Sequence, residues 1–171
     1  MRHTPQELES LQALLDRSAE RTGQHLRRTF ELPERSLSAA QLARYFEQPR
    51  PVALATVTAR GEPRVAPVHA VFYRGRFHIP TAADATRIAH VRKRPAVSLT
   101  HFVLNQVALI GHGRATALAA DHPEFAMLDQ LYRAEWWSQL RQQAGGVYLR
   151  IELETLYTWA LDPEEFPAYA L

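Results

Sequence analysis

The sequence predicts an α+β protein: a small closed β-barrel of about six strands, with helices before it and a helix inserted into it. Two patterns in the 171 residues carry this prediction. Short β-rich runs, separated by Gly and Pro turn signals, follow one another from residue 51 to residue 119 and return at residues 147–159. Helical periodicity is confined to the first 48 residues, to a basic stretch after residue 81 and to residues 121–140. Because no Gly-x-Gly-x-x-Gly motif follows a strand and no Walker loop is present, the sequence favours a barrel over a doubly wound sheet.

The N-terminal part of the chain has the pattern of amphipathic helices. Thr4-Pro5-Gln6-Glu7 combines an N-cap residue, Pro at the first helical position and an acidic first turn. The leucines that follow predict one helix that runs to about Arg28, because they recur at i, i+3 and i+4: Leu8, Leu11, Leu14 and Leu15. Ser38 caps a second, shorter predicted helix. We therefore divide the chain into an N-terminal helical extension, residues 1–48, and a barrel domain, residues 49–171.

The barrel strands are predicted from alternation, β-branched residues and the turns between them. The first turn, Ala59-Arg-Gly-Glu-Pro63, separates two apolar runs, and Arg74-Gly75 closes a tight hairpin. Asp121-His-Pro-Glu124 is expected to cap a helix that continues to about Leu140. The predicted strands are residues 52–58, 65–73, 76–80, 96–101, 106–119 and 147–159.

Composition bounds the possible functions. The chain has no cysteine, so disulfides, thiolate catalysis and Cys-based metal sites are excluded. Neither a basic stripe with interleaved aromatic residues nor a bilayer-length apolar run is present, so neither nucleic-acid nor membrane binding is expected. The polar N-terminus lacks a signal-peptide core, which makes the cytoplasm the expected location. The eight histidines include no pair at metal-ligand spacing, and no metal site is predicted.

One pair of residues has the chemistry of an anion site. Thr81 precedes Arg87 by six residues, at the predicted start of the basic helix. A hydroxyl and a guanidinium beside a helix N-terminus can hold a phosphate through charge-assisted hydrogen bonds.

Several short motifs, in order, resemble the pyridoxamine-phosphate-oxidase-like family of flavin-binding split barrels. These are Leu54-Ala-Thr-Val57, Gly61-Glu-Pro63, Val65-Ala-Pro-Val68, Thr81 with Arg87, Arg94-Pro-Ala-Val-Ser-Leu99 and Asn105-Gln-Val-Ala-Leu-Ile-Gly111. The resemblance extends from about Gln41 to Trp159. It implies a six-stranded FMN-binding split barrel that forms a homodimer, with the cofactor at the subunit interface.

The resemblance also implies which residues bind the cofactor. Thr81, Thr86 and Arg87 correspond to the FMN phosphate site, and Arg64 corresponds to a basic residue that also reaches the phosphate. Val65, Pro67, Val68 and His69 lie where the family places strand residues along the isoalloxazine edge. Gln106 matches a glutamine that the partner subunit offers to the flavin.

Two departures from the family pattern redirect the functional prediction. Ala85-Thr-Arg87 stands where the parent oxidase has Ser-Arg-Lys, and no segment like the one that binds pyridoxal phosphate follows Trp159. We therefore expect an FMN-dependent or deazaflavin-dependent (coenzyme F420) oxidoreductase that acts on a small organic substrate. The alternative is a non-catalytic flavin- or haem-binding protein on the same fold. No residue is assigned as catalytic; His69 and His112 are candidates for a proton donor or an axial haem ligand.

Overall fold

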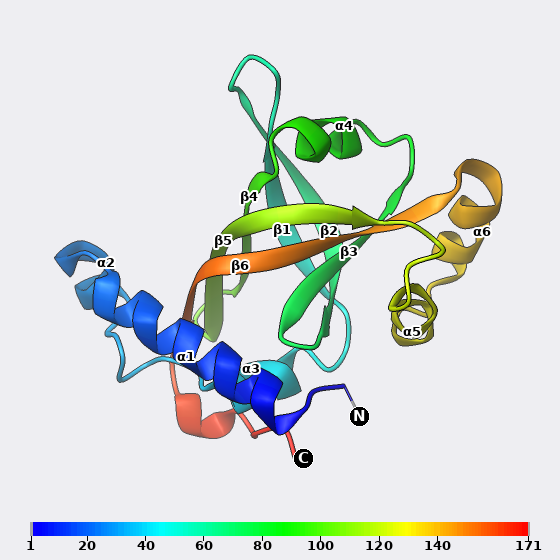
Figure 1. Cartoon of the computed structure of the whole chain (residues 1–171). Helices are drawn as coiled ribbons and strands as arrows, with labels where there is room; N and C mark the ends of the chain where they lie inside the picture. Colours follow the sequence, from blue (N-terminus) through cyan, green and yellow to red (C-terminus); the bar gives the residue numbers. More distant parts are fainter. Residues whose placement is uncertain (1, 171) are drawn as a thin grey trace.

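The computed structural model describes residues 2–170, and its centre is a closed barrel of six antiparallel strands (Figure 1). The strands follow the order β1-β2-β3-β6-β5-β4 around the barrel. Their bounds are β1 Arg50–Val57, β2 Pro63–Tyr73, β3 Arg76–Ala82, β4 Ala96–Val103, β5 Val107–Leu118 and β6 Gly146–Ala160. The predicted six-stranded barrel in an α+β protein is therefore confirmed.

The barrel closes because its longest strand, β6, pairs with β3 through one half and with β5 along most of its length. The register of β5 against β6 shifts between His112 and Gly113. A Cβ atom at Gly113 would overlap the carbonyl oxygen of Glu152, so this bulge requires glycine. Inward-facing residues of the strands, such as Leu54, Leu99 and Leu149, form one apolar core.

Three helices precede the barrel: α1 Pro5–Arg21, α2 Gln24–Thr29 and α3 Ala39–Tyr45. A complete capping box between Thr4 and Glu7 begins α1, as its sequence indicates. The buried stripe of α1 packs into the barrel core with α3. The expected continuation of α1 to Arg28 is wrong, because Thr22 and Gly23 adopt extended backbone and Gly23 becomes the N-cap of a separate helix.

The remaining helices interrupt the barrel sequence. Helix α4, Thr86–Lys93, connects β3 to β4, and helices α5, Phe125–Leu131, and α6, Glu135–Ala144, connect β5 to β6. The single helix expected over residues 121–140 is thus wrong in two respects. Asp121 does not cap it, since α5 begins after Glu124 without a side-chain cap, and the helix breaks at residues 132–134. The break places Trp137 in a second apolar cluster with Tyr148, while Trp136 remains 46% exposed.

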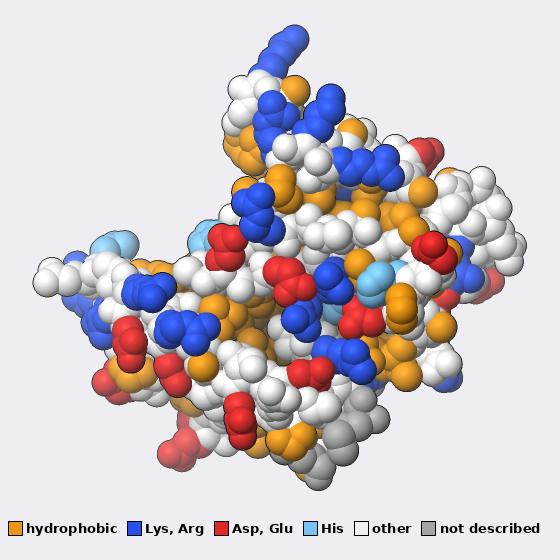
Figure 2. Space-filling view, viewed as in Figure 1, with side chains coloured by type: hydrophobic (Ala, Val, Ile, Leu, Met, Phe, Trp, Pro, Cys, Tyr) orange, Lys and Arg blue, Asp and Glu red, His pale blue; other side chains and the backbone are white. Residues whose placement is uncertain are grey.

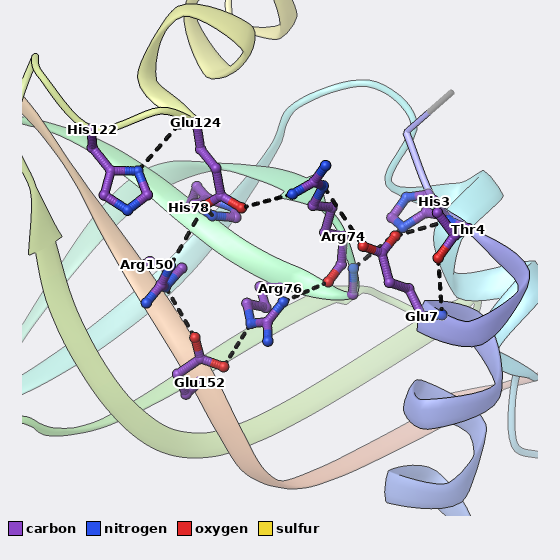
Figure 3. Close-up of polar contacts among 11 residues, drawn as sticks. His3, Thr4, Glu7, Arg74, Arg76, His78, His122, Glu124, Arg150 and Glu152 are labelled. Carbon is purple, nitrogen blue, oxygen red and sulfur yellow. Dashed lines mark hydrogen bonds and ion pairs between the residues drawn. The ribbon is translucent and has the colours of Figure 1, made fainter.

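A chain of charged side chains attaches α1 and α5 to the barrel (Figure 3). Arg74 lies 3.6 Å from Glu7 and 3.5 Å from Glu124, the residue just before α5. Glu124 also faces Arg150 of β6 at 3.6 Å and the buried His78 of β3 at 3.8 Å. Burial lowers the pKa of His78. The contact of Glu124 with His78, together with the positive charge of Arg150, lowers the pKa of Glu124 to about 2. The start of α5 is therefore held to the barrel by the contacts of Glu124 with these side chains rather than by a helix cap.

Candidate functional site

An open cleft of about 480 Å³ lies where α4 crosses the ends of β1 and β2. Strand β1 supplies Leu54 and Thr56, and Thr58 follows it in the turn. The start of β2 and the first two turns of α4 line the remaining walls, with Arg64, Val65, Ala66, Ala85, Thr86, Arg87 and His90. The lining contains two guanidinium groups and no carboxylate, which suits an anionic ligand. Basic side chains also gather around α4 on the surface at this end of the molecule (Figure 2).

Arg87 is the central cation of this cleft. Its Nη1 donates a hydrogen bond of 3.3 Å to Oγ1 of Thr81, which is buried at the end of β3. Partial burial of the guanidinium lowers the pKa of Arg87 from its ordinary value. Within residues 2–170 no carboxylate lies within 4.0 Å of it. A half-buried cation without a counter-ion fits an anion such as a phosphate.

The helix start adds neutral donors to this cation. Ala85, the N-cap of α4, offers no side-chain cap to the first turn. The amide of Ile88 donates to the carbonyl of Ala85 at 2.8 Å, whereas the amides of Thr86 and Arg87 have no acceptor inside the helix and lie at the positive end of its dipole. Thr86 is exposed on the same turn and lines the cleft. Thr81 lies before the helix, in β3, which extends through Ala82, and the helix begins at Thr86.

Arg64 lines the opposite wall of the cleft and does not touch Arg87. Its Nη2 forms a 2.7 Å ion pair with Glu62 in the neighbouring turn, and its side chain is 58% exposed. An exposed pair of this kind is weak, of about 0–1 kcal/mol, so Arg64 is free to exchange partners.

Two cleft residues were missed by the sequence analysis. Oγ1 of Thr56 and Nδ1 of His90 share a hydrogen bond of 3.0 Å across the floor between β1 and α4. His90 follows Arg87 by three residues, which places both on one face of α4. This helical spacing was a usable signal for His90, whereas nothing local identifies Thr56.

The predicted cofactor strip on β2, residues 65–69, divides between two faces of the sheet. Ala66 and Val68 pair with the inward-facing Leu54 and Val52 and share their face of the sheet. Val65, Pro67 and His69 are exposed on the outer face, and only Val65 also lines the cleft. His69 contacts a different element: its Nδ1 lies 2.9 Å from the hydroxyl oxygen of Tyr132, at the end of α5.

Gln106 is remote from the cleft within one chain. It is exposed in the turn between β4 and β5, at the end of β4 opposite to the connection from α4. His112 is also outside the cleft, exposed on β5 with its Nδ1 2.8 Å from Oγ of Ser98.

The outer face of β1, β2, β4 and β5 carries mainly apolar and small side chains. The strand pairing aligns Val65 and Pro67 with Ala55 and Ala53, and continues through Ser98 and Thr100 of β4. Phe102 on β4 is 69% exposed and Val65 is 67% exposed. We call this surface the β2–β4 face; its residues are Ala53, Ala55, Val65, Pro67, His69, Ser98, Thr100, Phe102, Ala108, Ile110 and His112.

Among residues 2–170, no group of three or more His, Asp or Glu side chains could hold a metal ion. In the same part of the chain, no helix combines the length and the apolar character needed to cross a membrane.

Comparison with known proteins places this geometry in context. Residues 38–160 match the family described as pyridoxamine 5'-phosphate oxidase. A search of curated proteins finds no match.

Solved structures share the fold at low sequence identity. A conserved hypothetical protein from Mycobacterium tuberculosis aligns with a TM-score of 0.61 and 19% identity, over 81% of this chain and 94% of its own. An FAD-binding protein from Mesorhizobium loti aligns with a TM-score of 0.57 and 20% identity, over 72% of this chain and 93% of its own. The haem storage protein HutZ from Vibrio cholerae aligns with a TM-score of 0.57 and 18% identity, over 70% of this chain and 92% of its own.

Proposed function

Because the chain belongs to the pyridoxamine 5'-phosphate oxidase family, we propose that it is a flavin-dependent oxidoreductase acting on a small organic substrate. Its cofactor is FMN, or alternatively a deazaflavin, with the phosphate held in the cleft beside α4. The family match covers the whole barrel, including every residue that lines the cleft.

The observation that carries the proposal is the environment of Arg87. Its guanidinium is half-buried, has no carboxylate partner within the described residues, and is oriented by Thr81 at a helix start. These features favour a ligand with concentrated negative charge and a shape that reaches the first turn of a helix. Arg64, once it leaves the exposed Glu62, adds a second charge from the facing wall.

In this proposal, the residues along β2 position the flavin. From the phosphate cleft, the outward-facing residues of the strip, Val65, Pro67 and His69, continue along the outer face of the barrel. A flavin bound along this face would supply hydride or two-electron chemistry. The chain would bind and orient the flavin and exclude water from one side of its ring.

We further propose that two copies of the chain form a homodimer through the β2–β4 face, with the cofactor at their interface. A surface rich in apolar and small residues, with Phe102 and Val65 both more than 60% exposed, supports this proposal. In such a dimer Gln106 of one copy becomes available to the cofactor bound by the other, which accounts for its distance from the cleft within one chain.

The experiment that tests the proposed function is an absorption spectrum of the freshly purified protein, followed by titration with FMN, the deazaflavin and riboflavin. Saturable binding of FMN or the deazaflavin, with riboflavin bound at least about tenfold more weakly than FMN, is expected if the cleft holds the phosphate. Arg87→Glu should remove this preference, and Arg92→Glu, an exposed position on the same helix outside the cleft, should retain it. Unchanged FMN affinity in Arg87→Glu would disprove the assignment of the cleft.

Turnover separates an enzyme from a non-catalytic binding protein. We expect the reduced holoprotein to transfer electrons to added small acceptors such as quinones. A cofactor that binds tightly but is not reoxidised by any acceptor would favour a storage or sensing role. A Soret band in the purified protein, lost in His69→Gln or His112→Gln, would favour haem.

A further inference from the structure

One side chain in the cleft at α4 belongs to the residue type that changes its charge near neutral pH: the imidazole of His90. It is half-buried and lines the cleft together with Arg64 and Arg87. Within residues 2–170, Nδ1 of His90 shares a hydrogen bond of 3.0 Å with Oγ1 of Thr56, and Nε2 has no hydrogen-bond partner. Since Nε2 is not one of the fully buried polar atoms without a partner, it is accessible to a ligand.

The geometry of α4 brings this ring toward the proposed phosphate site. His90 follows Arg87 by three residues, so both side chains lie on one face of the helix. Side chains of a helix lean toward its N-terminus, and a residue covers the turn that precedes its own Cα atom. The imidazole of His90 therefore leans toward the turn that carries Arg87, where the anion is proposed to bind.

The hydroxyl of Thr56 fixes the orientation of the imidazole. Thr56 is 4% exposed, and its backbone pairs with that of Arg64, so the hydroxyl has a fixed position on β1. A hydroxyl can donate to Nδ1 of a neutral ring and can accept from Nδ1–H of a protonated ring. The same hydrogen bond therefore serves both charge states of His90, and in both of them Nε2 carries a proton that it can donate to an anion.

The charges around the ring decide how it responds to a ligand. Arg87 of α4 and Arg64 of β2 line the cleft, and both oppose a third positive charge before an anion binds. Helix α4 also packs on β1 and β5; β1 adds no charged side chain to the lining, and Arg114 of β5 is exposed. Glu62 pairs with Arg64 from the turn and does not line the cleft. A bound phosphate would therefore supply the negative charge that favours a protonated ring.

We propose that His90 is a third phosphate-binding residue of this cleft, and that its ring takes up a proton from solvent when a dianionic phosphate monoester such as FMN binds. Thr56 acts as the positioning residue of the ring. The inference rests on the proposed function, because that function places the phosphate beside Arg87. It adds a regulation of the site: FMN affinity falls as the pH rises above 7, and esters with a single negative charge bind more weakly.

The first test is proton uptake on binding, measured by calorimetric titration at pH 7.5 in two buffers with different ionisation enthalpies. The ligands are FMN and riboflavin 5′-sulfate, which has a similar shape and one negative charge. We expect uptake of at least about half a proton per FMN bound, and of less than about a fifth of a proton per sulfate ester. FMN affinity should fall at least about threefold between pH 7 and 8.5, a range in which its phosphate remains mainly dianionic.

Substitutions identify the group that takes up the proton. His90→Gln keeps a side-chain N–H donor but cannot become charged, so it should still bind FMN, without proton uptake and without the pH dependence. Thr56→Val removes the hydroxyl at nearly the same shape and should reduce the uptake, whereas Thr56→Ser should retain it. His69→Gln is the matched control, because His69 is the histidine of the proposed flavin strip. This variant should take up protons as the wild type does.

Three outcomes would overturn the inference: tight FMN binding without proton uptake, uptake that persists in His90→Gln, or equal uptake with the sulfate ester. Circular dichroism and melting temperatures show whether a variant is folded, and the comparison of the two esters needs no variant. Binding of the deazaflavin without binding of FMN would overturn this inference and leave the proposed function standing. Binding of neither cofactor would overturn both.

Discussion

Nη1 of Arg87 lies 3.3 Å from Oγ1 of Thr81, although the two side chains belong to different elements, a helix and a barrel strand. Thr81 is 3% exposed and its backbone is fixed by pairing with Val147 of β6. The hydrogen bond to this hydroxyl therefore restricts the position of a guanidinium on a short surface helix relative to the barrel. A cation held in this way loses less conformational entropy when it binds a phosphate.

We expect Thr81→Val to weaken FMN binding severalfold, because valine has nearly the same shape but cannot accept the hydrogen bond from Arg87. Thr81→Ser keeps the acceptor and should retain the affinity. Stability should change by about 1 kcal/mol in either variant, because valine keeps the volume but loses the hydroxyl, and serine keeps the hydroxyl but loses one buried methyl group. Equilibrium titration with FMN, together with urea denaturation, checks both expectations. Equal FMN affinity in the Val and Ser variants would show that Thr81 does not position Arg87.

The barrel was predictable because its signals are local. Turn residues such as Gly75, with its positive φ, and alternating apolar residues fix each strand without reference to the rest of the fold. The pairing of Thr81 with Arg87 was predictable for the same reason, since Arg87 follows Thr81 by six residues and both lie at the ends of predicted elements. Local spacing also identifies the face of α4 that lines the cleft.

The contact between Tyr132, at the end of α5, and His69 on β2 was not predictable, because it joins distant segments of the chain. Tyr132 and His69 are 63 positions apart, and the contact exists only because the helix expected over residues 121–140 breaks. That break follows from long-range bonds, since Asp129 accepts from Trp137 of α6 and from Tyr148 of β6. Helical periodicity continues through the break, and the sequence therefore indicated one helix where tertiary hydrogen bonds require two.

We expect Asp129→Ala to destabilise the protein by about 2–4 kcal/mol, because it leaves two buried donors without an acceptor. Nε1 of Trp137 donates to Oδ1 of Asp129 at 2.9 Å, and the Tyr148 hydroxyl donates to the same atom at 3.1 Å. The ion pair with Arg141 is lost as well. Chemical denaturation followed by tryptophan fluorescence measures the change. Asp121→Ala, at an exposed position before α5, should change stability by less than about 0.5 kcal/mol.

Acid should destabilise the fold from about pH 6.5 downward, and His3 should contribute to this effect. His3 is 1% exposed, between the rings of Phe72 and Tyr169, and burial lowers its pKa from 6.5 to about 4. Between these two values the unfolded chain binds a proton that the folded chain does not, so the free energy of unfolding falls as pH falls. Such a shift lowers the free energy of unfolding by about 3 kcal/mol in total, and this loss is complete near pH 4.

Urea denaturation at pH 7.5, 6.0 and 5.0 measures this loss of stability. His3→Gln keeps an acceptor for the amide of Gly75 and does not titrate, so its stability should fall less steeply over this range. The slope should not vanish, because burial also lowers the pKa values of His78 and His101. His25→Gln, exposed on α2, should follow the wild-type curve. A wild-type curve that is flat between pH 7.5 and 5.0 would contradict the proposed burial of these rings.

The proposed dimer can be tested through Phe102, the most exposed aromatic side chain on the β2–β4 face. Phe102→Asp should leave the fold intact, since the ring is 69% exposed in the single chain. In a dimer built on this face the new charge would be buried without a partner, so the variant should sediment as a monomer in analytical ultracentrifugation. Ala126→Asp, on the exposed side of α5, provides the matched control and should remain dimeric.

Because the cofactor is proposed to lie at the interface, flavin affinity should fall together with dimerisation. A Phe102→Asp variant that stays dimeric and binds FMN normally would place the interface elsewhere, whereas a monomeric variant with unchanged FMN affinity would show that one chain holds the complete cofactor site.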